Sequence, residues 1–144
     1  MKIRRGRLED IESLAQLFDA YRVWYRKESD ITQAKSFLTD RLNFNESVIF
    51  VAELDGVLAG FTQLYPIFSS TRMKRMWLLN DLYVTEKHRQ QGIAKALIEK
   101  AKKLSNQTLS AGILLETEQT NEIGNHLYPS LGFKKEENNF YFWS

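Results

Sequence analysis

The residues with the clearest chemical potential lie in one strand–loop–helix stretch near the middle of the chain. An apolar run ending in Leu82-Tyr83-Val84 predicts a buried strand, and the polar loop from Thr85 to Gln91 leads on to Gly92. A following helix is predicted by apolar residues at spacings of three and four: Ile93, Leu97, Ala101 and Leu104. The first turn of a helix cannot satisfy its own N–H groups and carries a partial positive charge. Free donors from about Gln90 to Ala94 should therefore attract an anion, most naturally a phosphate.

Two residues of this stretch suit a phosphate. Gly92 has no side chain to block the approach of a ligand to the backbone, and Arg89 can add a permanently charged, bidentate contact. A glycine between a strand and a helix is also a common turn. The stretch matches neither frequent phosphate fingerprint, G-x-x-x-x-G-K-[ST] or G-x-G-x-x-G with an acidic residue ~20 positions on. A phosphate loop and a simple turn thus both remain open.

The stretch resembles the coenzyme A loop of the GCN5-related N-acetyltransferases (GNAT). Their signature is [RQ]-x-x-G-x-[GA] after a strand that ends in an apolar-aromatic-Val step, which is here Arg89 to Ala94 after Leu82-Tyr83-Val84. A second family block has an Asn after a strand, then a short helix with L-Y-x-x-x-G-F. It is matched by Asn121 after the strand Ile113–Thr117, and by Leu127 to Phe133. The resemblance extends over essentially all 144 residues, and the N-terminal half is most similar to the histone and polyamine acetyltransferase branch.

The resemblance implies direct transfer of the acetyl group of acetyl coenzyme A to an amine, without a covalent enzyme intermediate. It implies that the pyrophosphate binds the loop and that the cofactor arm lies between two parallel strands that splay apart. A backbone N–H of the first strand would polarise the thioester oxygen. The implied cofactor-binding residues are Leu82, Tyr83, Val84, Arg89, Gln90, Gln91, Gly92, Ile93, Ala94, Lys95, Asn121 and Tyr128.

Tyr128 occupies the position of the family's tyrosine. The resemblance implies that its phenol donates a proton to the departing thiolate as a general acid. The alternative is a core aromatic on a short helix. Asn121 also has two interpretations, either a hydrogen bond to the cofactor arm or a cap at the start of the helix, for which asparagine is well suited.

The general base is predicted among three carboxylates on or beside the two splayed strands: Asp81, Glu116 and Glu118. Asp81 and Leu82 point to opposite faces of their strand, so only one face of that strand can serve the substrate. Many enzymes of the family move this proton through a chain of water molecules, so that no single carboxylate need be essential.

Length and composition predict one cytoplasmic domain spanning residues 1–144, since 43% apolar and 26% charged residues are ordinary for a globular chain. No apolar run approaches the ~20 residues of a membrane span, and the N-terminus lacks the apolar region of a secretion signal. The chain has no cysteine, which excludes disulfides, a thiolate nucleophile and Cys-based metal sites. His88 and His126 have no companion ligands and are interpreted as surface residues, so no metal is predicted. A net charge of +2 is too small to indicate a nucleic-acid partner.

Periodicity and turn residues predict the other elements. Further helices are predicted at about Leu8–Tyr21, Ile31–Leu42 and Asn121–Ser130. Strands are predicted at Ile3–Arg5, Val48–Leu54, Val57–Tyr65, Arg75–Val84, Ile113–Thr117, Phe133–Glu136 and Phe140–Trp143. Asp55-Gly56 indicates a hairpin turn, whereas Pro66 and the Ser69–Thr71 cluster should break the sheet. The crossover through Leu104 requires a parallel strand pair. The prediction is a mixed α/β, GNAT-like acyl-CoA N-acyltransferase fold with a mostly antiparallel sheet, one splayed parallel pair and about four helices.

The acceptor is predicted to be a primary amine on a small molecule or polyamine, with a protein lysine or N-terminus as the second candidate. A coenzyme A sensor without catalysis and a nucleotide-binding module are the alternatives from other classes. The acceptor pocket is expected in the segments Tyr21–Asp30 and Tyr65–Lys74, because loops carry specificity. Four consecutive aromatic residues, Phe140 to Trp143, predict a terminal strand that must be covered, by a second copy in a homodimer or within its own chain.

Overall fold

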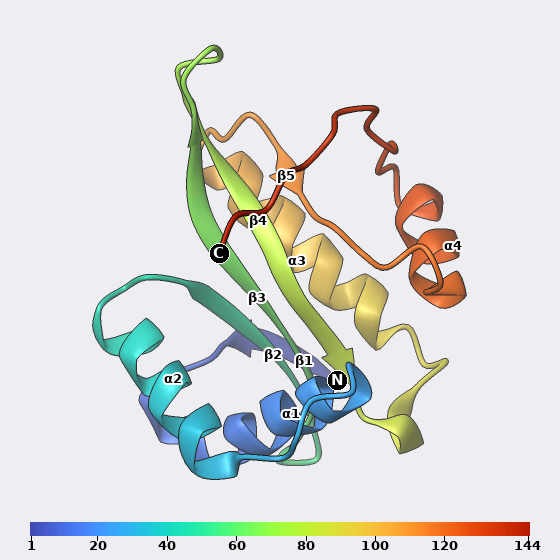
Figure 1. The fold of residues 1–144 in the computed structure, drawn as a ribbon. Coiled ribbons are helices and arrows are strands. Elements are labelled where there is room, and N and C mark those ends of the chain that lie inside the picture. The colour runs from blue at the N-terminus through green and yellow to red at the C-terminus, as the bar shows by residue number, and fades with distance from the viewer.

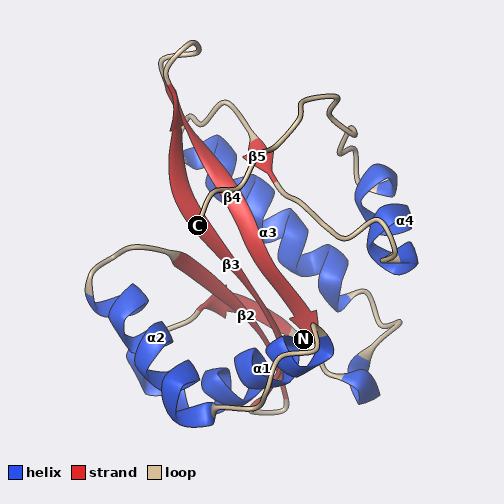
Figure 2. Ribbon diagram, viewed as in Figure 1, coloured by secondary structure: helices blue, strands red, loops and turns tan.

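A five-stranded sheet runs through the protein in the order β1-β2-β3-β4-β5, with helices on both faces (Figures 1 and 2). The computed structural model describes residues 1–144. The strands are β1 (Lys2–Arg5), β2 (Val48–Leu54), β3 (Val57–Ser69), β4 (Lys74–Val84) and β5 (Ile113–Leu114). The helices are α1 (Ile11–Trp24), α2 (Ile31–Asn43), α3 (Ile93–Gln107) and α4 (Glu122–Ser130), with short 3-10 turns at Leu8–Asp10 and Glu86–His88. β1 to β4 pair antiparallel and β4 pairs parallel with β5, which confirms the predicted mixed sheet.

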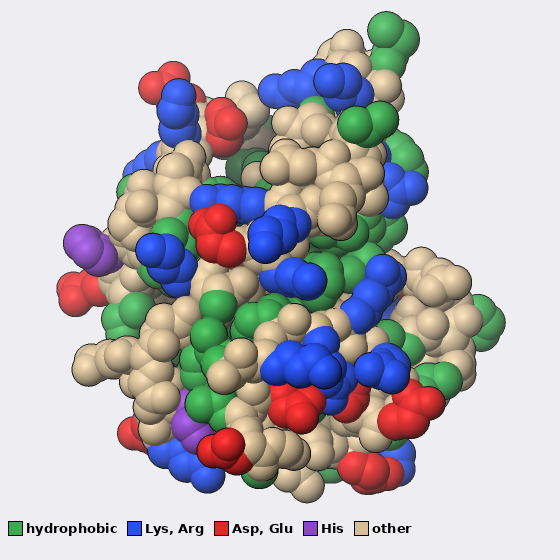
Figure 3. All heavy atoms as spheres, turned by 180° about the vertical axis from the view of Figure 1, so that it is seen from behind, with side chains coloured by type: hydrophobic (Ala, Val, Ile, Leu, Met, Phe, Trp, Pro, Cys, Tyr) green, Lys and Arg blue, Asp and Glu red, His purple; other side chains and the backbone are tan.

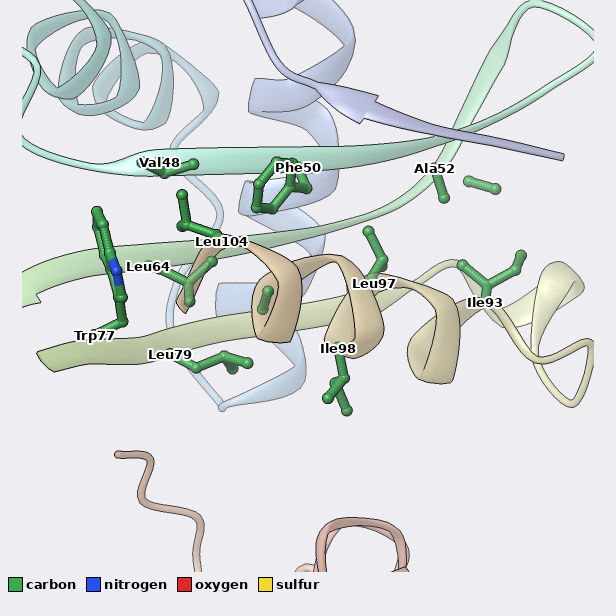
Figure 4. Close-up of a cluster of buried hydrophobic side chains, with 12 residues drawn as sticks. Val48, Phe50, Ala52, Leu64, Trp77, Leu79, Ile93, Leu97, Ile98 and Leu104 are labelled. Carbon is green, nitrogen blue, oxygen red and sulfur yellow. The ribbon is translucent and has the colours of Figure 1, made fainter. Parts of the chain in front are cut away.

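The sheet separates two hydrophobic clusters, because successive strand residues point to opposite faces. Phe50 and Ala52 of β2 pack with α3, whereas Ile49 and Val51 of the same strand pack with α1 and α2. In Figure 4 the side chains of α3 lie against those of β2, β3 and β4. The helix behind the predicted phosphate loop is thereby anchored to the middle of the sheet.

The β2–β3 hairpin forms as predicted. Asp55 and Gly56 both have positive φ values, 49° and 78°, as a two-residue turn of this kind requires. Pro66, however, does not break the sheet, because β3 continues to Ser69 and Pro66 lies opposite Trp77 of β4. The pairing of β2 with β3 ends at Leu64, so beyond it β3 has only one neighbour and the missing N–H of a proline is tolerated.

The two closing strands predicted from the sequence, Phe133–Glu136 and Phe140–Trp143, are not formed, and β5 is shorter than predicted. Residues 131 to 144 contain no strand, and the side chains of Tyr141, Phe142 and Trp143 are 91–93% exposed. Aromatic residues favour strands locally, but a strand also needs a partner edge, and this segment pairs with none in its own chain. The alternative that it packs within its own chain is therefore wrong.

Charge on the surface is mixed. On the face turned away from the view of Figure 1, Lys and Arg side chains alternate with Asp and Glu (Figure 3). No helix combines the length and apolarity that crossing a membrane would require.

Candidate active site

The loop between β4 and α3 presents free backbone donors, as the sequence predicts. Gly92 caps α3 with φ +78°, and Gln90 is also left-handed at φ 62°. The N–H groups of residues 90–95 have no acceptor among the backbone bonds of loops and caps, nor from any side chain. Ile93 is only 2% exposed, so its side chain fixes the start of the helix in the core. The loop therefore fits a pyrophosphate, which needs several donors and a positive helix end.

Two basic residues border this loop. The Arg89 Nε donates to the Val84 carbonyl at 3.0 Å, and its guanidinium lies 5.7 Å from the centre of the Tyr83 ring. These contacts hold the Arg89 side chain against the end of β4, and its two terminal nitrogens have no protein acceptor. Lys95 is exposed on the first turn of α3. Both side chains can therefore contact an anion on the loop.

The parallel pair separates beyond its first residues. β4 and β5 pair only at Trp77–Ile113 and Leu78–Leu114, although β4 continues to Val84. The backbone edge of Leu82, Tyr83 and Val84 thus has β3 on one side and no strand on the other. This is the splayed pair that the family resemblance implies, and its open edge leads toward the α3 loop.

A β-bulge sets the direction of the side chains in this part of β4. Asp81 lies opposite Gln63, but Leu79 lies opposite Leu64, so Asn80 is the extra residue. Leu82 packs against the α3 cluster and Asp81 faces the α1 side, which confirms the predicted opposite orientation. The bulge thus aims a carboxylate away from the hydrophobic core.

Asp81 is a buried carboxylate without a cationic partner. Its side chain accepts hydrogen bonds from Gln63 Nε2 at 2.7 Å and Asn80 Nδ2 at 3.1 Å, and the residue is 4% exposed. Gln63 is held in turn by the Ser47 hydroxyl, which donates to its Oε1 at 2.7 Å. Burial raises the pKa of Asp81, and the hydrogen bonds that its carboxylate accepts from Gln63 and Asn80 oppose that rise only in part. A carboxylate with a raised pKa is suited to accept a proton.

A cavity of about 440 Å³ opens beside Asp81, between α1 and the segment that follows β5. It is lined by Phe18, Tyr21, Arg22, Tyr25, Arg26, Lys27, Asp81 and Glu118. The predicted acceptor segment Tyr21–Asp30 thus supplies much of the lining. Tyr21 and Arg22 belong to the last turns of α1, whereas Tyr25, Arg26 and Lys27 follow the end of the helix at Trp24. The other predicted segment, Tyr65–Lys74, forms the end of the β3–β4 hairpin and does not line this cavity (Figure 1).

The two further candidate bases differ in position. Glu118 lines the cavity, and both of its oxygens accept from Arg26 Nη2 at 2.9 Å. Glu116 is exposed and does not line the cavity. Of the three carboxylates, only Asp81 and Glu118 are therefore brought together, and Glu118 is already paired with a cation.

Tyr128 lies in α4, with its ring packed against the α3 cluster and 5.9 Å from the ring of Phe133. Burial, with a smaller contribution from the neighbouring Tyr25 hydroxyl, raises the pKa of Tyr128 to about 12. The phenol is thus protonated near pH 7, as a proton donor must be. The packing of the Tyr128 ring and the protonated state of its hydroxyl are thus compatible with both interpretations, a core aromatic and a general acid.

Asn121 caps α4. Its side-chain oxygen accepts from the Gly124 N–H at 3.1 Å, and its Nδ2 donates to Thr117 Oγ1 at 2.8 Å. The capping interpretation is confirmed. Gly124 fits this cap closely, because a Cβ there would lie 2.6 Å from Asn121 Nδ2.

The histidines stay away from the cavity. His88 Nδ1 is hydrogen-bonded to Thr85 Oγ1 at 2.7 Å, and His126 is exposed. No three His, Cys, Asp or Glu side chains converge as a metal site would require.

Two residues near Asp81 are not singled out by the sequence. Phe18 lines the cavity although it precedes the predicted acceptor segment, whereas Tyr21 falls within that segment and its hydroxyl donates to the carbonyl of Asn80 at 3.3 Å. Gln63 was not singled out, although a glutamine inside a strongly apolar strand is a signal of a buried polar partner.

Comparison with known proteins agrees with this geometry. The model of the acetyltransferase (GNAT) family matches residues 11–133. An uncharacterized N-acetyltransferase of Bacillus subtilis, YhfO, is 41% identical over 136 residues, which are 94% of this chain and 91% of that protein. A probable acetyltransferase of Haemophilus influenzae is 38% identical over 83% of this chain and 82% of its own length. A crystal structure of a probable acetyltransferase superposes with a TM-score of 0.95 at 39% identity, covering 100% of this chain and 97% of that one.

The chain belongs to the GNAT family, and its activity is that of an acyl-CoA-dependent N-acetyltransferase. Enzymes of this family use acetyl coenzyme A as cosubstrate and an amine as acceptor.

Proposed function

We propose that this protein transfers the acetyl group of acetyl coenzyme A to a primary amine of a small molecule, polyamines included. The observation that supports this most directly is the position of Asp81 on the strand whose open edge leads to the α3 loop. The buried Asp81 carboxylate lies in the part of β4 that β5 does not pair, and the free N–H groups of residues 90–95 lie in the loop and helix start that follow β4. A cavity of about 440 Å³ is within the size range of small-molecule sites, which favours a small acceptor over a folded protein.

The residues present fit the cofactor. The N–H groups from Gln90 to Lys95 would hold the pyrophosphate, with Arg89 beside them, and the edge of Leu82 to Val84 would pair with the extended arm. Acetyl coenzyme A, when bound, supplies an acetyl thioester whose C–S bond breaks as the new C–N bond forms. No metal is needed for this chemistry.

Two side chains are proposed to move the protons. Asp81 would accept a proton from the acceptor ammonium, either directly or through a water molecule held in the cavity. The Tyr128 hydroxyl would hold the proton that neutralises the leaving sulfur. Asp81 belongs to β4, and Tyr128 belongs to α4, which follows β5 in the chain.

We further propose that the protein is a homodimer in which a second copy covers residues 140–143. β5 is the last strand of the sheet, so its outer edge has no partner, and the aromatic segment is 71–93% exposed and pairs with no strand of its own chain. Each large aromatic side chain buries ~150–250 Å². Because a twofold arrangement doubles every contact, four such residues would reach the ~1,200–2,000 Å² of a stable interface.

The function is tested by incubating the protein with acetyl coenzyme A and a panel of amines, and measuring the thiol that is released. We expect amine-dependent thiol release together with an acetylated amine by mass spectrometry. Binding of acetyl coenzyme A without release for any amine would instead identify a coenzyme A sensor. Release only with peptides that carry a free lysine or N-terminus would identify a protein acetyltransferase.

A further inference from the structure

The acceptor cavity carries a single uncompensated negative group. Asp81 is 4% exposed, and its hydrogen-bond partners Gln63 and Asn80 are neutral amides. No Lys, Arg or His nitrogen lies within 4.0 Å of its carboxylate. A buried charge of this kind needs a cation, and the ammonium group of an acceptor is the cation that the proposed reaction brings.

Uncompensated positive groups line the same cavity. The last turn of α1 and the residues after it contribute Arg22, Arg26 and Lys27. Arg26 is paired with Glu118, both of whose oxygens accept from Arg26 Nη2, whereas Arg22 and Lys27 have no carboxylate within 4.0 Å. The Arg22 Nη1 donates to the Glu28 carbonyl at 3.0 Å, which holds this cation in place without neutralising it. Because Arg26 and Glu118 pair with each other, the charged groups left to face the acceptor are the carboxylate of Asp81 and the cations of Arg22 and Lys27.

The remaining walls are aromatic. Tyr21 and Phe18 lie with ring centroids 6.2 Å apart, and Tyr25 packs edge-on against Tyr21 at 5.1 Å. These rings present an apolar surface between the buried carboxylate and the exposed cations. They would contact an apolar part of the acceptor and contribute as aromatic contacts do in other sites.

We propose that the acceptor is a zwitterionic amine: a molecule that carries a primary amine and an anionic group, such as a carboxylate, on an apolar or aromatic body. The ammonium would pair with Asp81, the anion with Arg22 and Lys27, and the apolar body with Tyr21 and Tyr25. This inference rests on the proposed function and narrows it. A polyamine carries a second positive charge instead, which would lie next to Arg22 and Lys27 and be repelled.

The test compares matched amines that differ only in the anionic group, phenylalanine against phenethylamine and lysine against cadaverine. kcat/KM is measured by thiol release. Protection against thermal unfolding by each amine, with coenzyme A present, gives a readout that needs no turnover. We expect the carboxylate-bearing amine to have a kcat/KM about tenfold higher or more, and to protect at lower concentration. Equal values, or better use of cadaverine, would overturn the proposal.

Two variants assign the preference to the cavity. Arg22→Gln and Lys27→Gln should each lower the ratio of kcat/KM between the paired amines, whereas Lys103→Gln, an exposed change on α3 away from the cavity, should keep it. The Lys27 side chain has no hydrogen bond or ion pair within the protein, so its variant tests charge while the backbone bond from the Lys27 N–H to the Arg22 carbonyl is kept. An unchanged ratio in both variants would refute the assignment. If no amine releases thiol, the proposed function fails. The thermal shifts of the same pairs still show whether the cavity binds the carboxylate-bearing amine more tightly than its partner.

Discussion

At the scale of single residues, the site contains two titratable groups whose pKa values are raised by burial, one a carboxylate and the other a phenol. Burial raises the pKa of Asp81, which makes this carboxylate a stronger base than an exposed aspartate. Burial also raises the pKa of Tyr128 to about 12, which keeps the phenol protonated. One group can therefore accept a proton and the other can donate one at the same pH.

Tyr128→Phe removes only the hydroxyl, because the ring that packs against Phe133 remains. The variant should fold normally and bind acetyl coenzyme A with nearly unchanged affinity. If the hydroxyl acts only as the sulfur leaves, kcat should fall ~10²-fold or more. Steady-state kinetics and calorimetric titration measure the two quantities. A large rise in the cofactor Kd at constant kcat would make Tyr128 a binding residue, and full activity would leave it a core aromatic.

Asp81→Asn separates activity from stability. A raised pKa means that the folded state holds its proton more tightly than the unfolded state. The carboxyl therefore lowers the free energy of unfolding progressively as pH rises from its ordinary value of 3.8 through its folded value. Asparagine does not ionise, so the variant should be more stable than the natural protein at pH 7 and equally stable below pH 3.8, as urea titrations at both pH values would show.

The same variant should lose activity. kcat/KM of the natural protein should fall as the pH drops through the raised pKa of Asp81, because a protonated carboxyl cannot act as a base. Asp81→Asn should lose this acid limb together with ~10²–10⁴-fold in rate. A pH profile that is identical in the variant would indicate that water molecules alone carry the proton.

At the scale of elements, the strand–loop–helix unit is the part that decides cofactor binding. Gly92 has φ +78°, a conformation that β-branched residues rarely adopt, and an added Cβ would meet no atom within 4 Å. In the free protein, glycine is therefore favoured at position 92 by its backbone conformation. In the complex with coenzyme A, we expect it to be favoured also because a side chain would block the phosphate.

Gly92→Val should weaken coenzyme A binding at least tenfold, equivalent to about 1.4 kcal/mol. Gly56→Val is a matched control, because Gly56 has the same φ of +78° and the same open surroundings in the β2–β3 turn. The control should lower stability in a similar way and leave the cofactor Kd unchanged. Calorimetric titration of both folded variants measures this, and equal Kd values for the two would place the cofactor elsewhere.

The elements predicted well from the sequence are those whose signals are local. The α3 stripe, the Asp55-Gly56 turn and the motif around Gly92 each depend on neighbours a few residues away. The closing strands were wrong because the aromatic run from Phe140 shows strand preference but not which edge it pairs with. The bulge at Asn80 was not visible either, since one extra residue leaves the apolar pattern of β4 almost unchanged. Gln63, which donates to the Asp81 carboxylate, lies 18 positions earlier in the chain, so this contact could not be predicted without the fold.

At the scale of the whole molecule, the exposed aromatic segment is the feature that a single chain leaves unexplained. Phe140, Tyr141, Phe142 and Trp143 are 71–93% exposed, and exposed patches of this kind mark interaction sites. The outer edge of β5 has no strand partner, so a strand from a second copy could pair with it.

The double variant Phe142→Ser/Trp143→Ser should convert the proposed homodimer to a monomer, because it removes the two most C-terminal anchors. Light scattering during size exclusion at micromolar concentration measures the mass. Phe44→Ser is the control, since Phe44 is an equally large aromatic, 71% exposed at the end of α2. The proposal would be refuted by a natural protein that is monomeric at these concentrations.

The parting of β4 from β5 also ties the lifetime of the protein to its metabolic surroundings. Backbone groups along an open strand edge are satisfied by water until an extended ligand arm replaces it, so the folded state gains free energy only when that arm is present. By mass action, a ligand at a hundred times its Kd stabilises the folded state by ~2.7 kcal/mol. Scarcity of the acyl donor would then raise the fraction of open molecules that proteases can cleave, and the abundance of the enzyme would follow the supply of its donor.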